Sequence, residues 1–223
     1  MEYRHEIKHM ITPGDAVAVR CNLSAVARLD PHAGKEGCYR VQSLYFDDLK
    51  DTALWEKLDG VDERSKFRIR WYNGDLSYIM LERKIKQGQA SCKLQEALKP
   101  EELRRIMDGD TAWMAGCGRP LALKLYAEMK TRGLRPRCLV EYMRMPFVYG
   151  PGQVRVTIDW NIRTGTPKAF IASHELTLPV MGNPILLEVK WGEYLPAVIR
   201  RAAGLKNRQA SSFSKYAASR MYG

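Results

Sequence analysis

Alternation of ionic and apolar side chains is the feature that most constrains this fold. Residues 66–71 read KFRIRW, so a lysine and two arginines alternate with Phe67, Ile69 and Trp71. Successive side chains of a β-strand point to opposite faces, and this run therefore predicts a strand with one ionic and one apolar face. The same pattern recurs over residues 79–86, 154–160 and 185–190. A sheet that is ionic on one side is expected.

Turn signals predict that these strands are antiparallel. Residues 65–72 and 77–86 flank Asn73-Gly74, a pair that tolerates the positive φ of a hairpin turn. Residues 137–148 and 153–162 flank a second turn with Gly150 and Gly152. Further strands are predicted at 3–10, 39–46, 91–97 and 185–191, and helices at 12–29, 51–58, 100–107, 121–131, 194–204 and 211–221. The expected fold class is α+β, with residues 1–223 forming a single domain.

The ionic faces allow two interpretations. They could be the solvated faces of an antiparallel sandwich. Alternatively, the apolar faces could pack outward against the helices, so that the ionic faces line a closed barrel of about eight strands. The ionic faces are rich in cations, and the whole chain has 36 Lys and Arg against 25 Asp and Glu, a formal net charge of +11. Because clustered cations repel one another, the second interpretation predicts an anionic ligand.

Phosphate is the anion that these side chains suit best. Arginine forks and lysine ammonium groups match phosphate oxygens, and scattered carboxylates can seat a phosphate-bridging divalent metal. A Glu-x-Lys unit recurs at residues 6–8, 82–84 and 188–190, which places each pair on one strand face.

Seven motifs in order resemble one known family: YRHEIKH, VQSLYFDD, KFRIRWY, LERKIK, EYMRMPF with VRVTIDWN, LLEVKW and FSKYAASR. They resemble the VTC domain, the polyphosphate polymerase domain of the vacuolar transporter chaperone family, within the triphosphate tunnel metalloenzymes. The resemblance implies a closed eight-stranded antiparallel barrel with helices outside. It also implies an ATP-polyphosphate phosphotransferase, with ATP and inorganic polyphosphate as partners and Mn²⁺ or Mg²⁺ as the metal.

Site residues follow from the same motifs. Catalytic roles are expected for Arg68, Arg70 and Arg155, which would hold the transferred phosphoryl group, and for Lys190, which with Lys84 and Lys93 would guide the product. The phosphate- and nucleotide-binding residues implied by the resemblance are Lys8, Lys84, Lys93, Tyr142, Arg144, Ser214 and Lys215. Glu188 resembles the metal-binding carboxylate, and we expect Glu6 or Glu82 to assist it.

Departures from the family pattern keep other activities open. Triphosphatases of this superfamily open with Glu-x-Glu-x-Lys, whereas this chain has Arg4 at the first position of that motif, which favours the polymerase. A metal-dependent triphosphatase is the alternative, because water could replace the acceptor phosphate. A non-catalytic barrel that binds polyphosphate, or one that binds nucleic acid through Trp55, Trp71, Tyr72 and Trp191, is a further alternative. No specific nucleic acid partner is expected.

Cysteine usage and hydropathy predict the location. The five cysteines form no CxxC pair, and the charged N-terminus lacks the layout of a secretory signal. No apolar stretch approaches the ~20 residues of a membrane-spanning helix. A cytoplasmic protein is expected, with any membrane protein acting as a partner in trans. His5 and His9 are interpreted as structural, because their spacing does not bring two imidazoles together on a strand.

Overall fold

One antiparallel sheet organises the computed structural model, which describes residues 4–88, 90–167, 177–205 and 208–222. Eight of its ten strands follow a continuous path in the order β1-β10-β8-β7-β3-β4-β5-β6. In chain order these are β1 (His5–Ile11), β3 (Tyr39–Asp47), β4 (Arg64–Tyr72), β5 (Asp75–Gln87), β6 (Ala90–Leu98), β7 (Arg135–Tyr149), β8 (Val154–Gly165) and β10 (Ile185–Trp191). The short strands β2 (Arg28–Leu29) and β9 (Leu178–Pro179) pair with β7 and β8.

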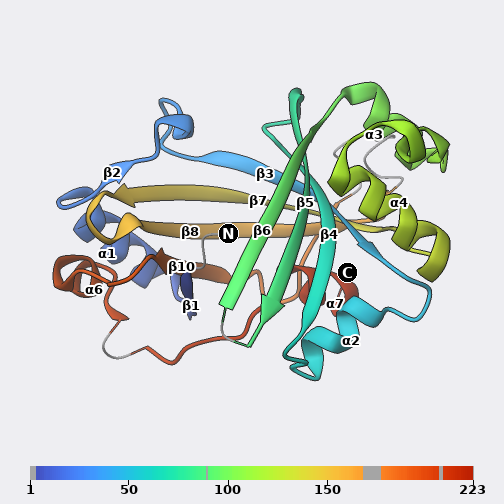
Figure 1. Cartoon of the computed structure of the whole chain (residues 1–223). Helices are drawn as coiled ribbons and strands as arrows, with labels where there is room; N and C mark the ends of the chain where they lie inside the picture. The colour runs from blue at the N-terminus through green and yellow to red at the C-terminus, as the bar shows by residue number, and fades with distance from the viewer. Residues whose placement is uncertain (1–3, 89, 168–176, 206–207, 223) are drawn as a thin grey trace.

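The sheet is strongly curled, and β4, β5 and β6 cross steeply over the long β7 and β8 (Figure 1). The α+β fold and its eight antiparallel strands are therefore as predicted. Closure into a barrel is not shown, because among the described residues no backbone ladder joins the end strands β1 and β6. A side-chain ion pair does link β1 to β5, since Lys84 Nζ lies 3.3 Å from Glu6 Oε2.

Helices pack on both faces of the curled sheet (Figure 1). They are α1 (Pro13–Ser24), α2 (Thr52–Leu58), α3 (Pro100–Met107), α4 (Pro120–Arg132), α6 (Ala197–Ala202) and α7 (Lys215–Tyr222), with short 3₁₀ turns at Pro31–Ala33, Ala112–Gly116 and Pro151–Gln153. Phe67, Ile69 and Trp71 of β4 are buried in a core with Leu103 of α3 and Leu125 of α4.

A second outer core lies at the other end of the sheet, where Val156 of β8 and Val189 of β10 are buried with Leu23 of α1 and Ile199 of α6. The apolar faces thus point outward to the helices. The ionic faces are left on the inside of the curl, as the barrel interpretation predicted.

Three predicted helix boundaries are wrong, and two of them are set by contacts with distant strands. The first helix begins as expected, with a capping box between Thr12 and Asp15, but it ends at Ser24 because residues 28–29 pair with β7 instead. The helix predicted from residue 194 begins only after Pro196. The last helix begins at Lys215, because Ser211 upstream donates its N–H to the carbonyl of Lys8 at 2.7 Å.

Asp47 joins α2 to α7 at one rim of the sheet. Its buried carboxylate accepts hydrogen bonds from the N–H groups of Ala53 and Leu54 at 2.9 and 3.1 Å, and from the hydroxyl of Tyr216. Asp51 accepts two further bonds from Arg220 of α7, both at 2.9 Å. The acidic residues of the VQSLYFDD motif and its connector therefore hold both helices against the sheet.

We expect Tyr216→Phe to lower the free energy of unfolding by about 1.5–3 kcal/mol, because a hydrogen bond to a buried carboxylate is lost while the ring is retained. Urea denaturation followed by circular dichroism measures this change. Tyr149→Phe, on the half-buried end of β7, is the control. A Tyr216→Phe protein as stable as the wild type would show that this contact does not hold α7 in place.

Candidate functional site

The inner face of the sheet encloses a cavity of about 1040 Å³. Side chains two residues apart on each strand point into it, as the alternation predicts. Its lysines and arginines come from seven strands of the path, from helices α2 and α7, and from the residue before β1. They are Arg4, Lys8, Lys57, Arg64, Lys66, Arg68, Arg70, Lys84, Lys86, Lys93, Arg144, Arg155, Lys190 and Lys215. The carboxylates that line it are Glu6, Glu56 and Glu188.

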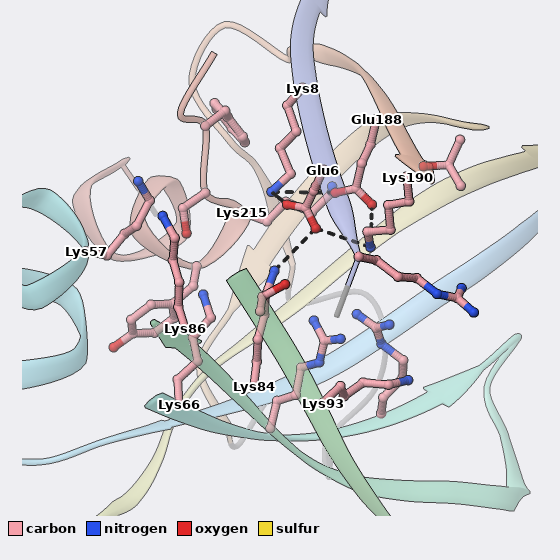
Figure 2. Close-up of a pocket in the computed structure, with 18 of the residues that line it drawn as sticks. Glu6, Lys8, Lys57, Lys66, Lys84, Lys86, Lys93, Glu188, Lys190 and Lys215 are labelled. Atoms are coloured by element: carbon pink, nitrogen blue, oxygen red, sulfur yellow. Dashed lines mark hydrogen bonds and ion pairs between the residues drawn. The ribbon is translucent and has the colours of Figure 1, made fainter. Parts of the chain in front are cut away.

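Glu6 and Glu188 form one cluster with three lysines (Figure 2). Strands β1 and β10 pair Glu6 with Lys190 and Lys8 with Glu188, so all four side chains lie on one face. Lys8 Nζ lies 2.7 Å from Glu6 and 3.5 Å from Glu188, and Lys190 Nζ lies 3.5 Å from Glu6 and 2.8 Å from Glu188. Lys84 reaches Glu6 from β5 across the cavity.

The charges of this cluster keep both carboxylates ionised. Burial and the nearby Glu188 raise the pKa of Glu6, but Lys8, Lys190 and Lys84 outweigh them and lower it to about 2. Burial likewise opposes ionisation of Glu188, yet Lys190 and Lys8 hold its pKa well below the usual range. Two adjacent anions are therefore present at neutral pH.

Glu82 lies in a different cluster from Glu6 and Glu188. Its carboxylate is 2.6 Å from Arg68 Nε and 3.1 Å from Lys93 Nζ, and it is almost fully buried. Burial raises its pKa, but Arg68, Arg70 and Lys93 outweigh this and lower the pKa to about 2. The structure thus places Glu82 as a counterion beside Arg68 and Lys93, and not with Glu188, the carboxylate that Glu6 or Glu82 was expected to assist in holding a metal.

Asp159 is the counterion of a third cluster. It is fully buried and accepts hydrogen bonds from Arg144 at 2.7 and 2.8 Å and from Lys215 at 2.7 Å. Tyr142 lies beneath both cations, with its ring centroid 4.5 Å from Lys215 Nζ. The neighbouring Ser214 lines the cavity, and its hydroxyl accepts the N–H of Ala217 at 3.3 Å, which caps α7.

Arg70 and Lys66 differ from these cations, because no carboxylate of the described residues lies within ion-pair distance of either. Arg70, 8% exposed, donates to the hydroxyls of Ser43 at 3.1 Å and Tyr142 at 3.4 Å. The Lys66 ammonium lies 5.5 and 5.6 Å from the ring centroids of Tyr45 and Tyr216. An anionic ligand would therefore gain the most electrostatic binding energy from contacts with these two cations.

The same surroundings lower the pKa values of Lys66 and Tyr45. Burial, followed by the charges of Lys84 and Arg68, lowers the pKa of Lys66 to about 8, although Tyr45 opposes this. Burial raises the pKa of Tyr45, but Arg68, Lys66 and Arg70 outweigh it and lower that pKa to about 7. Both groups titrate near neutral pH because the cavity carries more positive than negative charge.

A divalent metal fits the Glu6–Glu188 pair. Mg²⁺ is commonly held by one or two carboxylates together with substrate phosphates, and two ionised carboxylates lie here on adjacent strands. The described residues contain no group of three or more His, Cys, Asp or Glu placed to hold a metal. Phosphate oxygens or water would have to supply the remaining ligands.

The structure brings together nearly all residues expected in the site. Thirteen of them line the cavity: Glu6, Lys8, Arg68, Arg70, Lys84, Lys93, Tyr142, Arg144, Arg155, Glu188, Lys190, Ser214 and Lys215. Glu82 is not among the residues that line the cavity, and it forms an ion pair with Arg68, which does line it. Arg155 extends from β8 to Asp30 and to the hydroxyl of Tyr39, at 2.9 Å each.

Several cavity residues were missed as site residues. Parity placed Lys66 and Lys86 on the ionic faces with the expected cations, but neither was assigned a role in the site. Tyr45 of β3 also lines the cavity. Lys57 comes from α2, and nothing in its local sequence indicates that it faces the cavity. His9 is buried and bonded through Nδ1 to the Gln209 carbonyl at 2.9 Å, in keeping with its structural interpretation.

Comparison with known proteins identifies a family profile that matches this chain and solved structures with a similar fold. The VTC domain profile matches residues 3–222. A putative adenylyl cyclase from Hippeastrum, described as having a dominant triphosphatase activity, is similar in structure with a TM-score of 0.57 and 15% identity over 99% of this chain and 95% of its own.

A putative adenylate cyclase from Bacillus halodurans has a TM-score of 0.52 and 12% identity over 86% of this chain and 82% of its own. A conserved hypothetical protein from Pyrococcus furiosus has a TM-score of 0.51 and 12% identity, over 95% and 96%. At these identities the structures share the fold alone. No curated protein matches the sequence. Within the described residues, no helix is long and apolar enough to cross a membrane.

We expect the stability of the ligand-free protein to rise between about pH 7 and pH 10. Tyr45 and Lys66 have lower pKa values in the folded chain than the roughly 10 and 10.4 of unfolded tyrosine and lysine. The unfolded chain therefore binds more protons over this interval, so that a rise in pH favours the folded state. Affinity for tripolyphosphate should fall several-fold over the same interval, as Lys66 loses its charge.

Urea unfolding and calorimetric titration at pH 7, 8 and 9 measure both effects. In Lys66→Met the increase of stability with pH should be weaker, because one of the groups that titrate in this interval is gone. A wild-type stability that falls from pH 7 to pH 9, or a Lys66→Met profile identical to the wild type, would contradict this account of the cavity.

Proposed function

Since the chain belongs to the VTC domain family, we propose that it is a polyphosphate polymerase that transfers the γ-phosphoryl group of ATP to a polyphosphate chain in the basic cavity. The observation that carries this proposal is the excess of inward-facing cations, with Arg70 and Lys66 held in place but not neutralised by a described carboxylate. Such a cavity is best completed by a ligand with many negative charges.

Arginines on two walls would hold the transferred phosphoryl group. Arg68 and Arg70 project from β4, with Arg68 oriented by Glu82 and Arg70 by the hydroxyls of Ser43 and Tyr142. Arg155 projects from β8 and is oriented by Asp30. Because their donors are already held in place, little reorganisation is needed as charge shifts during phosphoryl transfer. Lys84, Lys93 and Lys190 would guide the product chain.

No general base is required of the protein for the polymerase reaction. The terminal phosphate of the acceptor chain is already an anion, and the main obstacle is repulsion between two polyanions. Glu6 and Glu188 would hold the divalent metal, which when bound would neutralise charge on phosphoryl oxygens. Lys8 and Lys190 keep these carboxylates ionised and would themselves contact phosphate.

A metal-dependent triphosphatase is the second candidate, favoured by one feature of the site. Glu6 and Glu188 lie together although the first glutamate of the triphosphatase opening is replaced by Arg4. Two carboxylates beside a metal could also position a water molecule for attack on the γ-phosphate. A nucleic-acid-binding barrel has less support, because Trp71 is fully buried in the outer core and cannot stack on a base.

Purified protein incubated with ATP and Mn²⁺ should produce a ladder of polyphosphate on a gel, together with ADP. Orthophosphate is measured by colorimetry in the same tube. Orthophosphate without a ladder would reject the polymerase and favour the triphosphatase. The absence of both products would reject catalysis of either kind.

Arg70→Ala and Lys190→Ala should each lower the rate of synthesis by about 10²-fold or more, the size of effect seen when a preorganised transition-state donor is removed. Neither side chain contributes to the outer cores, so the thermal midpoint should change little. Arg200→Ala, on the exposed side of α6, is the matched control and should retain full activity. Normal synthesis by both cavity variants would refute the assignment.

A further inference from the structure

The inner face of the sheet changes from cationic to aromatic along its strands. On β4 the inward-facing residues Lys66, Arg68 and Arg70 are followed by Tyr72, and on β3 Tyr39 lies at the same end. Register places Tyr72 opposite Val41, on the same face as Tyr39 two residues away. Tyr78 of β5 completes a row of rings across three neighbouring strands.

The three tyrosines contact one another in sequence. Tyr39 and Tyr72 meet edge to face, with centroids 5.5 Å apart, and Tyr72 and Tyr78 are tilted by 34° with centroids 6.3 Å apart. Tyr39 is buried, Tyr72 is half-buried and lines the cavity, and Tyr78 is 56% exposed. The row therefore runs from the cavity wall outward and presents aromatic surface at the mouth.

This aromatic end adjoins the arginines proposed to hold phosphate. Tyr39 accepts a hydrogen bond from Arg155 at 2.9 Å, and Tyr39 is paired with Arg144 across the β3–β7 ladder. Arg70 lies two residues before Tyr72, about 7 Å along the strand. A pentose is of comparable length, so a base on Tyr72 and phosphates on Arg70 and Arg155 are compatible with one nucleotide.

The opposite ends of β4 and β5 carry cations in place of tyrosines. Arg64 of β4 and Lys86 of β5 are paired in register there, and Lys57 of α2 lies beside them in the cavity wall. Burial, and then the charges of Arg64, Lys8 and Lys86, lowers the pKa of Lys57. Cations that repel one another suit a phosphate chain rather than a base.

We propose that Tyr72 and Tyr78 form a stacking platform for the nucleobase of a nucleoside triphosphate, at the end of the cavity opposite the Lys57–Arg64–Lys86 cluster. This inference rests on the proposed function, to which it adds the residues that contact the base. Stacking on aromatic rings is tolerant of base identity, because every base has a π-face. The site therefore takes nucleoside triphosphates as a class and binds ATP and GTP alike.

The test compares ligands with and without a base. Calorimetric titration at constant ionic strength measures the affinities of β,γ-imido-ATP, β,γ-imido-GTP and inorganic tripolyphosphate for the wild type and for Tyr72→Leu and Tyr78→Leu. Each substitution should weaken both nucleotides by about 5-fold or more, in line with the cost of losing one stacked ring. Tripolyphosphate affinity should stay within about twofold, because the triphosphate-binding arginines are unchanged.

Tyr78→Phe and Tyr72→Phe retain the rings and should retain nucleotide affinity. Tyr78 is exposed, so its variants keep the test valid even if Tyr72→Leu fails to fold. Equal losses for nucleotides and tripolyphosphate, or no loss for either, would overturn the platform and leave the phosphate site standing. Phenylalanine variants as weak as the leucine variants would also overturn stacking. A wild type that binds none of the three ligands would reject the proposed function together with the platform.

Discussion

Charge balance inside the curled sheet is the constraint on which the rest of this structure depends. A row of arginines and lysines on the inner face of several strands would repel itself strongly in a poorly solvated space. Four buried or nearly buried carboxylates offset this repulsion, and each is shared by at least two cations. They are Glu6, Glu82, Asp159 and Glu188. The positive charge that remains favours the binding of an anion in the cavity.

Hydrophobic burial on both faces of the sheet supports this interior. Two cores lie on the outer face, where the side chains of β4, β8 and β10 pack against α3, α4, α1 and α6. A third lies on the inner face, where α2 and α7 pack against β3 and β7. The hydrogen bonds that Asp47 accepts from α2 and α7 then fix the rim from which Lys57 and Lys215 enter the cavity. The polar interior is therefore held by packing around it.

Membership of the VTC domain family agrees with a site for triphosphates. The two ends of the inner face differ, since one offers π-surfaces and the other carries charge. Polymerase and triphosphatase activities would use the same phosphate contacts and differ in the nucleophile admitted.

The period-two alternation in the sequence was enough to determine which residues form strands and which side chains share a face. It identified Arg68, Arg70, Lys84, Arg155 and Lys190 as neighbours of one surface, because parity is a local property of extended backbone. Strands were predictable for the same reason, and most helices were predictable from their capping and terminating residues. Helix ends were not, since they depend on partners such as β7 for residues 28–29.

Only the tertiary structure decided which charges meet. The curl of the sheet brings Glu6 to Lys84 across 78 residues, gives Glu82 to Arg68 rather than to the Glu6–Glu188 pair, and buries Asp159 beneath Arg144 and Lys215. It also turns Lys57 of α2 into the cavity and aligns tyrosines from three strands. These are distances between strands and helices far apart in the chain, which depend on twist and packing and leave no local pattern in the sequence.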